Sequence, residues 1–289
     1  MVEYLLISNL YNEEHNVDAL FDSVESQTMP PALWLIVDDG STDGTNRLIL
    51  ERANSTRLKV RVWTGPIKNK PDHDTIGLSI KMALGSLDEE TYRGFGYYCV
   101  LDADSRVAPT YFEELLGRME RDPKLGMASG IIWTKDGAER TRSDLARGSG
   151  RATKAEIWLS VPIDDLPEVA SDAFFNAKTK MMGFSSAMFE DLRVVEQRPT
   201  SQVTPAGRYR RGRLMAMFWY SPFVVLAHAV SILSHGRNPL PLIRGYLDGL
   251  KGKRVQDPSV RAYFGRRMVL DWLKERLLRR RGGPGSSVT

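Results

Sequence analysis

Short apolar runs alternate with amphipathic stretches over the first 135 residues, and this alternation constrains the fold more than any other feature of the chain. It is typical of a mainly parallel sheet covered by helices, in which each strand is buried on both faces. Between the first two runs, Val17, Leu20, Phe21 and Val24 recur at helical spacing. The sequence therefore predicts an α/β fold. Strands are expected at residues 4–9, 33–38, 59–64, 96–101 and 126–132.

The composition is that of a globular protein that needs no disulfide bonds for stability. The chain has 289 residues, of which 42% are hydrophobic and 26% are charged, enough to bury a full core. Its one cysteine, Cys99, lies in an expected strand and permits neither an intramolecular disulfide nor a thiolate metal cage. This composition fits a reducing compartment, and we expect the cytoplasm.

Charge is divided unevenly along the chain. Residues 206–289 hold 17 lysines and arginines against 4 aspartates and glutamates, a net charge of +13, whereas residues 1–205 carry −9. The sequence predicts three parts: a body at 1–205, a basic and partly apolar helical extension at 206–281, and a disordered tail at 282–289. A basic extension indicates an anionic partner such as a membrane surface, a phosphorylated lipid or nucleic acid. A solvated basic face is the alternative.

An uncharged run of 20 residues, 214–233, lies within the extension. At roughly 1.5 Å per residue it could just span a bilayer as one helix, but Pro222 interrupts it. We expect a kinked pair of helices at a membrane interface. A helix packed on the body is the second alternative, and a true membrane span is the third. The side chains expected to enter lipid are Met215, Phe218, Trp219 and Phe223.

Acidic residues follow three of the expected strands. Glu13 and Glu14 come after the first strand, Asp38 and Asp39 close the second, and the segment Asp102-Ala103-Asp104 follows the fourth. The carboxyl ends of parallel strands meet at one edge of a sheet, where functional groups gather. Carboxylate oxygens suit Mg²⁺ or Mn²⁺. Helix capping or a solvated turn is the alternative interpretation of each motif.

Four motifs occur together in an order that resembles family 2 glycosyltransferases of the GT-A fold. They are Tyr11-Asn12-Glu13-Glu14, Ser23-Val24-Glu25-Ser26-Gln27-Thr28, the segment 37–45 around Asp38-Asp39-Gly40, and Asp102-Ala103-Asp104. The resemblance covers about residues 4–135 and continues more loosely to about residue 220. It implies inverting transfer of a sugar from a UDP- or GDP-type nucleotide sugar, assisted by Mg²⁺ or Mn²⁺.

Carried over by position, the resemblance assigns roles to five residues. Tyr11 and Glu13 would line the nucleoside pocket, and Asp39 would hydrogen-bond the base. Asp102 would face the ribose or the metal, and Asp104 would bind the metal that bridges the diphosphate. A metal at this place would neutralise charge on the departing diphosphate.

The resemblance also implies a catalytic base in the second half of the chain, because an inverting transferase must take a proton from the acceptor hydroxyl. Asp172 occupies the corresponding place before an expected helix. The family motif has a second acidic residue beside it, whereas Ser171 and Ala173 flank Asp172 in this chain. The alternative is that Ser171 caps the helix and Asp172 interacts with its dipole.

Three further residues are candidates on weaker grounds. Glu196 lies where many relatives carry a histidine near the metal, so it is a candidate third ligand, with an exposed strand end as the alternative. Arg211 and Arg213 belong to an arginine cluster that would clamp the donor diphosphate or, alternatively, form a basic patch beside a membrane. The segment 68–74 departs from the glycine-rich loop of relatives and is interpreted as an insertion or a determinant of sugar choice.

These observations favour an inverting glycosyltransferase that acts on a hydroxyl acceptor at the cytoplasmic face of a membrane, in cell-surface glycan or glycolipid synthesis. A lipid-linked acceptor would then be presented by the basic extension. Two rivals are a polyprenyl-phosphate glycosyl synthase and a catalytically silent protein that binds nucleotide sugars or membranes. Nucleic acid is not an expected partner, because no stacking platform accompanies the basic residues.

Overall fold

The computed structural model describes residues 2–67, 76–139, 142–197 and 204–268. The expected insertion at 68–74 and, at 282–289, the expected disordered tail lie outside these ranges. The chain forms two compact units, residues 1–199 and residues 200–289, and each is described by itself.

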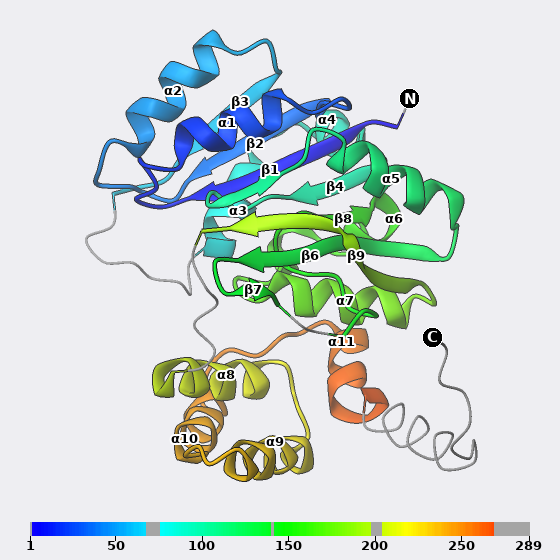
Figure 1. Cartoon of the computed structure of the whole chain (residues 1–289). Coiled ribbons are helices and arrows are strands. Elements are labelled where there is room, and N and C mark those ends of the chain that lie inside the picture. Colours follow the sequence, from blue (N-terminus) through cyan, green and yellow to red (C-terminus); the bar gives the residue numbers. More distant parts are fainter. Residues whose placement is uncertain (1, 68–75, 140–141, 198–203, 269–289) are drawn as a thin grey trace. The chain divides into compact units, whose positions relative to one another are not determined.

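The first unit is built on one mixed sheet of nine strands (Figure 1). The strand order is β3-β2-β1-β4-β8-β6-β9-β5, with β7 paired to the end of β6. Strands β3, β2, β1 and β4 are parallel to one another, and β8 then runs antiparallel to β4. The strands are β1 (Tyr4–Leu10), β2 (Leu33–Asp38), β3 (Val60–Thr64), β4 (Tyr97–Val100), β5 (Ser105–Val107), β6 (Leu125–Thr134), β7 (Gly137–Ala138), β8 (Arg151–Lys154) and β9 (Ser185–Glu196).

All five predicted strands are present, with ends within two residues of the predicted ends. Of β9 the sequence indicated only a strand end near Glu196. The short strands β5, β7 and β8 were not predicted. Each of these has two to four residues, too short to show a hydrophobic period. Their place in the sheet comes from pairing with longer strands, since β5 lies on β9 and β8 lies between β4 and β6.

Two layers of helices cover the sheet (Figure 1). Alternate residues of β1 point to opposite faces, so Leu6 packs in the core under α1, α2 and α5, while Leu5 and Ile7 are buried on the other face. The helices of the first layer are α1 (Val17–Glu25), α2 (Thr45–Ser55) and α5 (Tyr111–Arg121). On the other face lie α3 (Ile76–Gly85), α6 (Ala155–Trp158) and α7 (Ser171–Met181), while α4 (Glu89–Arg93) and a 3-10 turn (Ile163–Asp165) are short connecting elements.

An aromatic stack joins α6 and α7 to the sheet. The Trp158 ring lies parallel to Tyr98 of β4 at 5.0 Å between ring centroids and parallel to Phe175 of α7 at 4.6 Å. The Trp158 indole N–H donates to the Tyr92 hydroxyl at 3.1 Å. Large aromatic side chains contribute most to such cores, so this stack fixes α7 against the sheet.

The second unit is helical: α8 (Pro205–Met217), α9 (Pro222–Ser234), α10 (Leu240–Gly249) and α11 (Pro258–Ala262), which continues into a π turn (Tyr263–Arg267). Its core gathers Met215, Val225, Leu242 and Tyr246. Helices α8 and α10 cross closely at Gly245, where any larger residue would place a Cβ atom against the Tyr209 carbonyl.

The uncharged run 214–233 forms parts of two helices, as the sequence predicted. Trp219 has a positive φ of 59° in the break between them, and Pro222 begins α9. The expected set of lipid-facing side chains was wrong in part. Met215 and Phe218 are buried, and the half-buried Trp219 donates its indole N–H to the Val255 carbonyl at 2.9 Å. Phe223 alone of the four is exposed.

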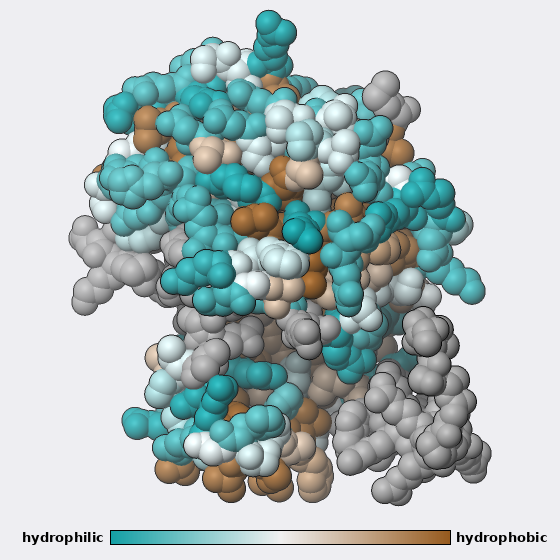
Figure 2. Space-filling model, viewed as in Figure 1, coloured by the Kyte–Doolittle hydropathy of each residue, from teal (hydrophilic) through white to brown (hydrophobic). Residues whose placement is uncertain are grey.

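Four exposed apolar side chains of the second unit lie on α9. Phe223, Leu226, Val230 and Leu233 follow one another at helical spacing on α9 and are 59–81% exposed. Figure 2 shows hydrophobic surface on this part of the unit. Within the described ranges, no helix combines the length and hydropathy that crossing a bilayer requires.

Candidate functional site

The predicted donor residues meet at the carboxyl edge of the parallel strands. Leu10 of β1 pairs with Asp38 of β2, and Ile7 of β1 pairs with Val100 of β4. The loops that carry Tyr11, Glu13, Asp39 and Asp102 therefore leave the sheet at the same edge. This convergence follows from the parallel register of the three strands.

The loops after β1 and β2 are tied together by hydrogen bonds. The Glu13 backbone N–H donates to Thr45 Oγ1 at 2.7 Å, and the Thr42 N–H donates to Asn12 Oδ1 at 2.8 Å. Asn12 has a φ of 53°, in the left-handed region that asparagine tolerates better than most residues. Glu13 is buried, and its Oε2 accepts the Asn16 side-chain amide at 2.7 Å. The loop after β1 is thus a fixed surface.

The two adjacent carboxylates at the end of β2 have different surroundings. Asp38 accepts the Ser41 N–H at 3.0 Å and the Asn46 side-chain amide at 2.8 Å, which stabilises the turn and the start of α2. Asp39, which is 2% exposed, accepts a hydrogen bond from the Ser79 hydroxyl of α3. Stabilisation of the turn, the alternative to a binding role, therefore accounts for Asp38. Asp39 instead forms a polar pair with Ser79 at the edge of the sheet.

The segment Asp102-Ala103-Asp104 is held by the Gly148-Ser149-Gly150 loop before β8. The Asp102 N–H donates to Ser149 Oγ at 2.9 Å, and Ser149 Oγ lies 2.7 Å from Ser105 Oγ. Ser105 and Ser149 are buried, while the Asp102 side chain is exposed. The loop therefore fixes the backbone of Asp102 and leaves its carboxylate accessible.

Glu196 lies close to both aspartates. It pairs with Ser105 across β9 and β5, and the Gln197 N–H donates to the Asp104 carbonyl. Burial raises the pKa of Glu196 to about 8, and the negative charges of Asp102, Asp104 and Glu139 act in the same direction. The structure thus gathers carboxylates whose repulsion a divalent cation would relieve, and these oxygen donors fit Mg²⁺ or Mn²⁺. In the described part of the chain, no three acidic, histidine or cysteine side chains already adopt metal-binding geometry.

Asp172 lies in the first turn of α7, one residue after the helix begins, and the start of the helix also differs from the expected alternative. Ala170, in the left-handed conformation at φ 51°, occupies the capping position, and no side chain caps the helix. The Ser171 hydroxyl instead accepts a hydrogen bond from Arg151 Nη2 at 2.7 Å. Ser171 as the helix cap was therefore the wrong interpretation. Backbone strain of this kind often accompanies functional sites.

Sequence reasoning missed several residues of this edge. Arg151, Ser149 and Ser79 contact the predicted residues or their helices, and Arg147 forms an ion pair with Glu139 beside Glu196. The Gly-Ser-Gly segment before Arg151 was the available signal, because two glycines around a serine favour a tight loop.

The two candidate arginines lie elsewhere in the chain. Arg211 and Arg213 are exposed residues of α8, in the second unit. Their role as diphosphate ligands stays a prediction.

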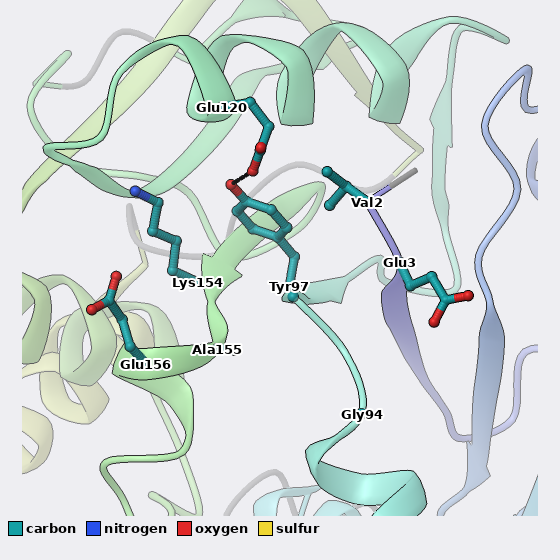
Figure 3. A pocket seen from close by; sticks show the side chains of 9 residues that line it. Val2, Glu3, Gly94, Tyr97, Glu120, Lys154, Ala155 and Glu156 are labelled. Atoms are coloured by element: carbon teal, nitrogen blue, oxygen red, sulfur yellow. Dashed lines mark hydrogen bonds between the residues drawn. The ribbon is translucent and has the colours of Figure 1, made fainter.

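A pocket of about 520 Å³ opens near the start of β4 (Figure 3). Tyr97 and Glu120 point toward each other there, and the Tyr97 hydroxyl donates to Glu120 at 2.6 Å. Tyr97 begins β4, whereas Asp102 follows its end, so the pocket lies at the opposite edge of the sheet from the predicted residues. We therefore place the candidate site at the carboxyl edge and not in this pocket.

Comparisons with known proteins agree with the fold. The family described as "Glycosyl transferase family 2" matches residues 6–168, more than half of the chain. The chain belongs to glycosyl transferase family 2. The fold and family predicted from the sequence are confirmed. No curated protein matches the chain in a sequence search.

Solved structures with the same GT-A fold are distant in sequence. S. aureus TarS, residues 1–349, is 16% identical with a TM-score of 0.54, and the match covers 74% of this chain and 64% of that one. A TarS structure in complex with UDP-GlcNAc matches equally well. The mannosyltransferase PcManGT from Pyrobaculum calidifontis, in complex with GDP-Man and Mn²⁺, is 17% identical with a TM-score of 0.55, covering 99% of this chain and 76% of that one. The chain thus spans less than two thirds of the TarS 1–349 chain.

Proposed function

We propose that the protein is an inverting glycosyltransferase that moves a sugar from a nucleoside-diphosphate sugar to a hydroxyl acceptor. The observation that carries the proposal is the cluster of Asp102, Asp104 and Glu196 at the edge where the donor loops converge, since their charges act on one another. Structural neighbours crystallised with UDP-GlcNAc and with GDP-Man and Mn²⁺ support a nucleotide-sugar donor of the UDP or GDP type.

The donor would bind along this edge. Tyr11 and Glu13 line the nucleoside, Asp39 accepts a hydrogen bond from the base, and Asp102 faces the ribose or the metal. Asp104, with Asp102 and Glu196, would hold Mg²⁺ or Mn²⁺, which neutralises charge on the diphosphate when bound. Arg211 and Arg213 are proposed as additional diphosphate contacts, because guanidinium groups bind phosphate oxygens in a bidentate manner.

Asp172 would act as the base. In a single displacement, its carboxylate takes the proton of the acceptor hydroxyl while the hydroxyl oxygen attacks the anomeric carbon and the bond to the diphosphate breaks. Asp172 lies in the first turn of α7, and α7 is fixed to the sheet by the stack of Phe175 on Trp158. A fixed base contributes more than a mobile one, because correct placement removes much of the entropic part of the barrier.

We also propose that the second unit docks on an anionic membrane at the cytoplasmic face. Its exposed α9 face would enter the interface, and the +13 charge of residues 206–289 would be attracted to acidic lipid. An acceptor in cell-surface glycan or glycolipid synthesis, if lipid-linked, would then lie at the same surface.

The experiment is donor consumption. Wild-type protein with Mn²⁺ is incubated with UDP-GlcNAc and GDP-Man, with water accepting the sugar in place of the natural hydroxyl, and release of the nucleoside diphosphate is measured against Asp172→Asn and Glu89→Gln. Glu89 is 82% exposed on α4, which precedes β4, so it serves as a control remote from the site. We expect Mn²⁺-dependent release of UDP or GDP, lost in Asp172→Asn and kept in Glu89→Gln. A wild type that consumes neither donor would contradict the proposal.

A further inference from the structure

Arg151 is a buried charged side chain at the start of β8. It is 3% exposed and is the one buried lysine or arginine within the described ranges. A guanidinium stays charged in proteins, and an uncompensated buried charge costs several kcal/mol. Burial lowers the pKa of Arg151, and the negative charges of Asp172 and Asp102 are the strongest influences that oppose this shift. A charge so placed is expected to have a function.

The hydrogen bonds of Arg151 join two segments that are distant in the sequence. Nη1 donates to the Gly148 carbonyl in the loop before β8, and Nη2 donates to Ser171 Oγ in the first turn of α7 at 2.7 Å. The Nε–H is buried and has no hydrogen-bond partner. The forked guanidinium group of Arg151 therefore connects the loop that fixes Asp102 to the helix that carries Asp172.

The same loop holds the first of the paired aspartates. Ser149, two residues before Arg151, accepts the Asp102 N–H at 2.9 Å. A second contact between the loop region and α7 comes from Asn176, whose side chain bonds both the N–H and the carbonyl of Ala146 and also the Asp172 carbonyl. The start of α7, which lacks a side-chain cap, is thus oriented by residues 146–151.

We propose that Arg151 is a positioning residue that holds the Asp172 carboxylate at a fixed place beside the Asp102 loop. It does so by linking the Gly148 carbonyl to the Ser171 side chain and by placing a positive charge near both Asp102 and Asp172. This inference rests on the proposed role of Asp172 as the base. Lysine could supply the charge but not the planar fork that reaches two acceptors.

A double-mutant cycle tests the inference. Mn²⁺-dependent release of nucleoside diphosphate is measured, with UDP-GlcNAc and GDP-Man as probes, for wild type, Arg151→Met, Asp172→Asn and the double variant. We expect Arg151→Met to lower kcat on the order of 10²-fold, as a misplaced group does, with KM changed by less than about threefold. Because Arg151 acts through Asp172, the double variant should be no slower than Asp172→Asn by more than about threefold.

Two outcomes of the cycle would overturn the proposal. Multiplicative losses in the double variant would mean that Arg151 acts independently of Asp172. A rise in KM with kcat unchanged would make Arg151 a donor-binding residue. Arg151→Lys, which keeps the charge, should recover part of the lost kcat if charge compensation matters, and no recovery beyond Arg151→Met would contradict that half of the proposal.

A milder variant covers the case in which Arg151→Met fails to fold. Ser171→Ala removes one acceptor of the fork and leaves the buried charge in place. We expect faster amide hydrogen exchange at residues 171–176 in Ser171→Ala than in Ser160→Ala, whose hydroxyl donates to the Ile157 carbonyl instead. Equal exchange in the two variants would refute the link. This readout needs no turnover, so a wild type that consumes no donor would refute the proposed function separately.

Discussion

Substitution of Gly150 by alanine should destabilise the first unit strongly, although it adds a single methyl group. Gly150 has a φ of 65°, in the left-handed region, where an alanine residue costs about 1–2 kcal/mol. Its Cβ would collide with a methyl group of Val194 and would lie 2.7 Å from the Tyr111 hydroxyl oxygen. That hydroxyl donates to the Gly150 carbonyl at 2.6 Å and accepts the Gly130 N–H at 2.7 Å.

The magnitude follows from these two terms. Overpacking a filled core costs typically about 1–3 kcal/mol, so strain and collision together predict a loss of about 2–5 kcal/mol of unfolding free energy. Gly148 provides a matched control in the same loop, because a Cβ there meets nothing within 4 Å and its φ is not in the left-handed region. Gly148→Ala should change stability by less than about 1 kcal/mol.

Urea unfolding of the three proteins gives the comparison. With a slope of about 1–3 kcal/mol per M, Gly150→Ala should lower the midpoint by about 1 M or more, and Gly148→Ala should leave it nearly unchanged. Equal stabilities for Gly150→Ala and wild type, or equal losses in the two variants, would refute this account of the loop.

Three further predictions concern the stack, the base and the helical unit. Trp158→Ala should lower the unfolding free energy by about 3–5 kcal/mol, because it removes a ring stacked on Tyr98 and Phe175. Thermal unfolding measures this loss, and Tyr92→Phe is the control because it removes only the hydroxyl that accepts the Trp158 indole N–H. Asp172→Asn should lower transfer to a hydroxyl acceptor on the order of 10²–10⁴-fold, as measured by product formation, whereas activity near that of wild type would favour a phosphate acceptor and the polyprenyl-phosphate synthase alternative. Phe223→Asp together with Leu226→Asp should weaken co-sedimentation with vesicles that contain anionic phosphatidylglycerol, because both side chains are more than half exposed on α9. The control Leu50→Asp, on α2, should leave co-sedimentation unchanged. Unchanged binding of the double variant would exclude α9 as the docking face.

The first half of the first unit could be predicted from the sequence because its signals are local. The strands Leu33–Asp38 and Tyr97–Val100 are continuous apolar runs, and in each the acidic motif follows at the strand end. Parallel pairing then brings these ends to one edge without any further information. The sequence therefore predicted the fold and the convergence of Asp39, Asp102 and Asp104.

The rest depends on contacts between distant residues. Arg151 and Ser171 are 20 positions apart and meet only because β8 enters the sheet beside β4. Likewise, the partial burial of Trp219 follows from its hydrogen bond to Val255 and from the Arg254 and Arg261 guanidinium groups, which lie 4.4 and 4.0 Å from its ring. Hydrophobicity alone predicted that this residue enters lipid, and tertiary packing overrides such a prediction.

Calorimetric titration of UDP and GDP, with and without Mn²⁺, tests most directly whether the carboxyl edge is a metal-assisted nucleotide site. Wild type, Asp104→Ala and the remote control Glu89→Gln are compared. The account predicts that one nucleotide binds in the presence of Mn²⁺, that binding weakens at least about tenfold without the metal or in Asp104→Ala, and that Glu89→Gln behaves as wild type. Binding that is equally tight in Asp104→Ala, or no binding of either nucleotide to wild type, would contradict it.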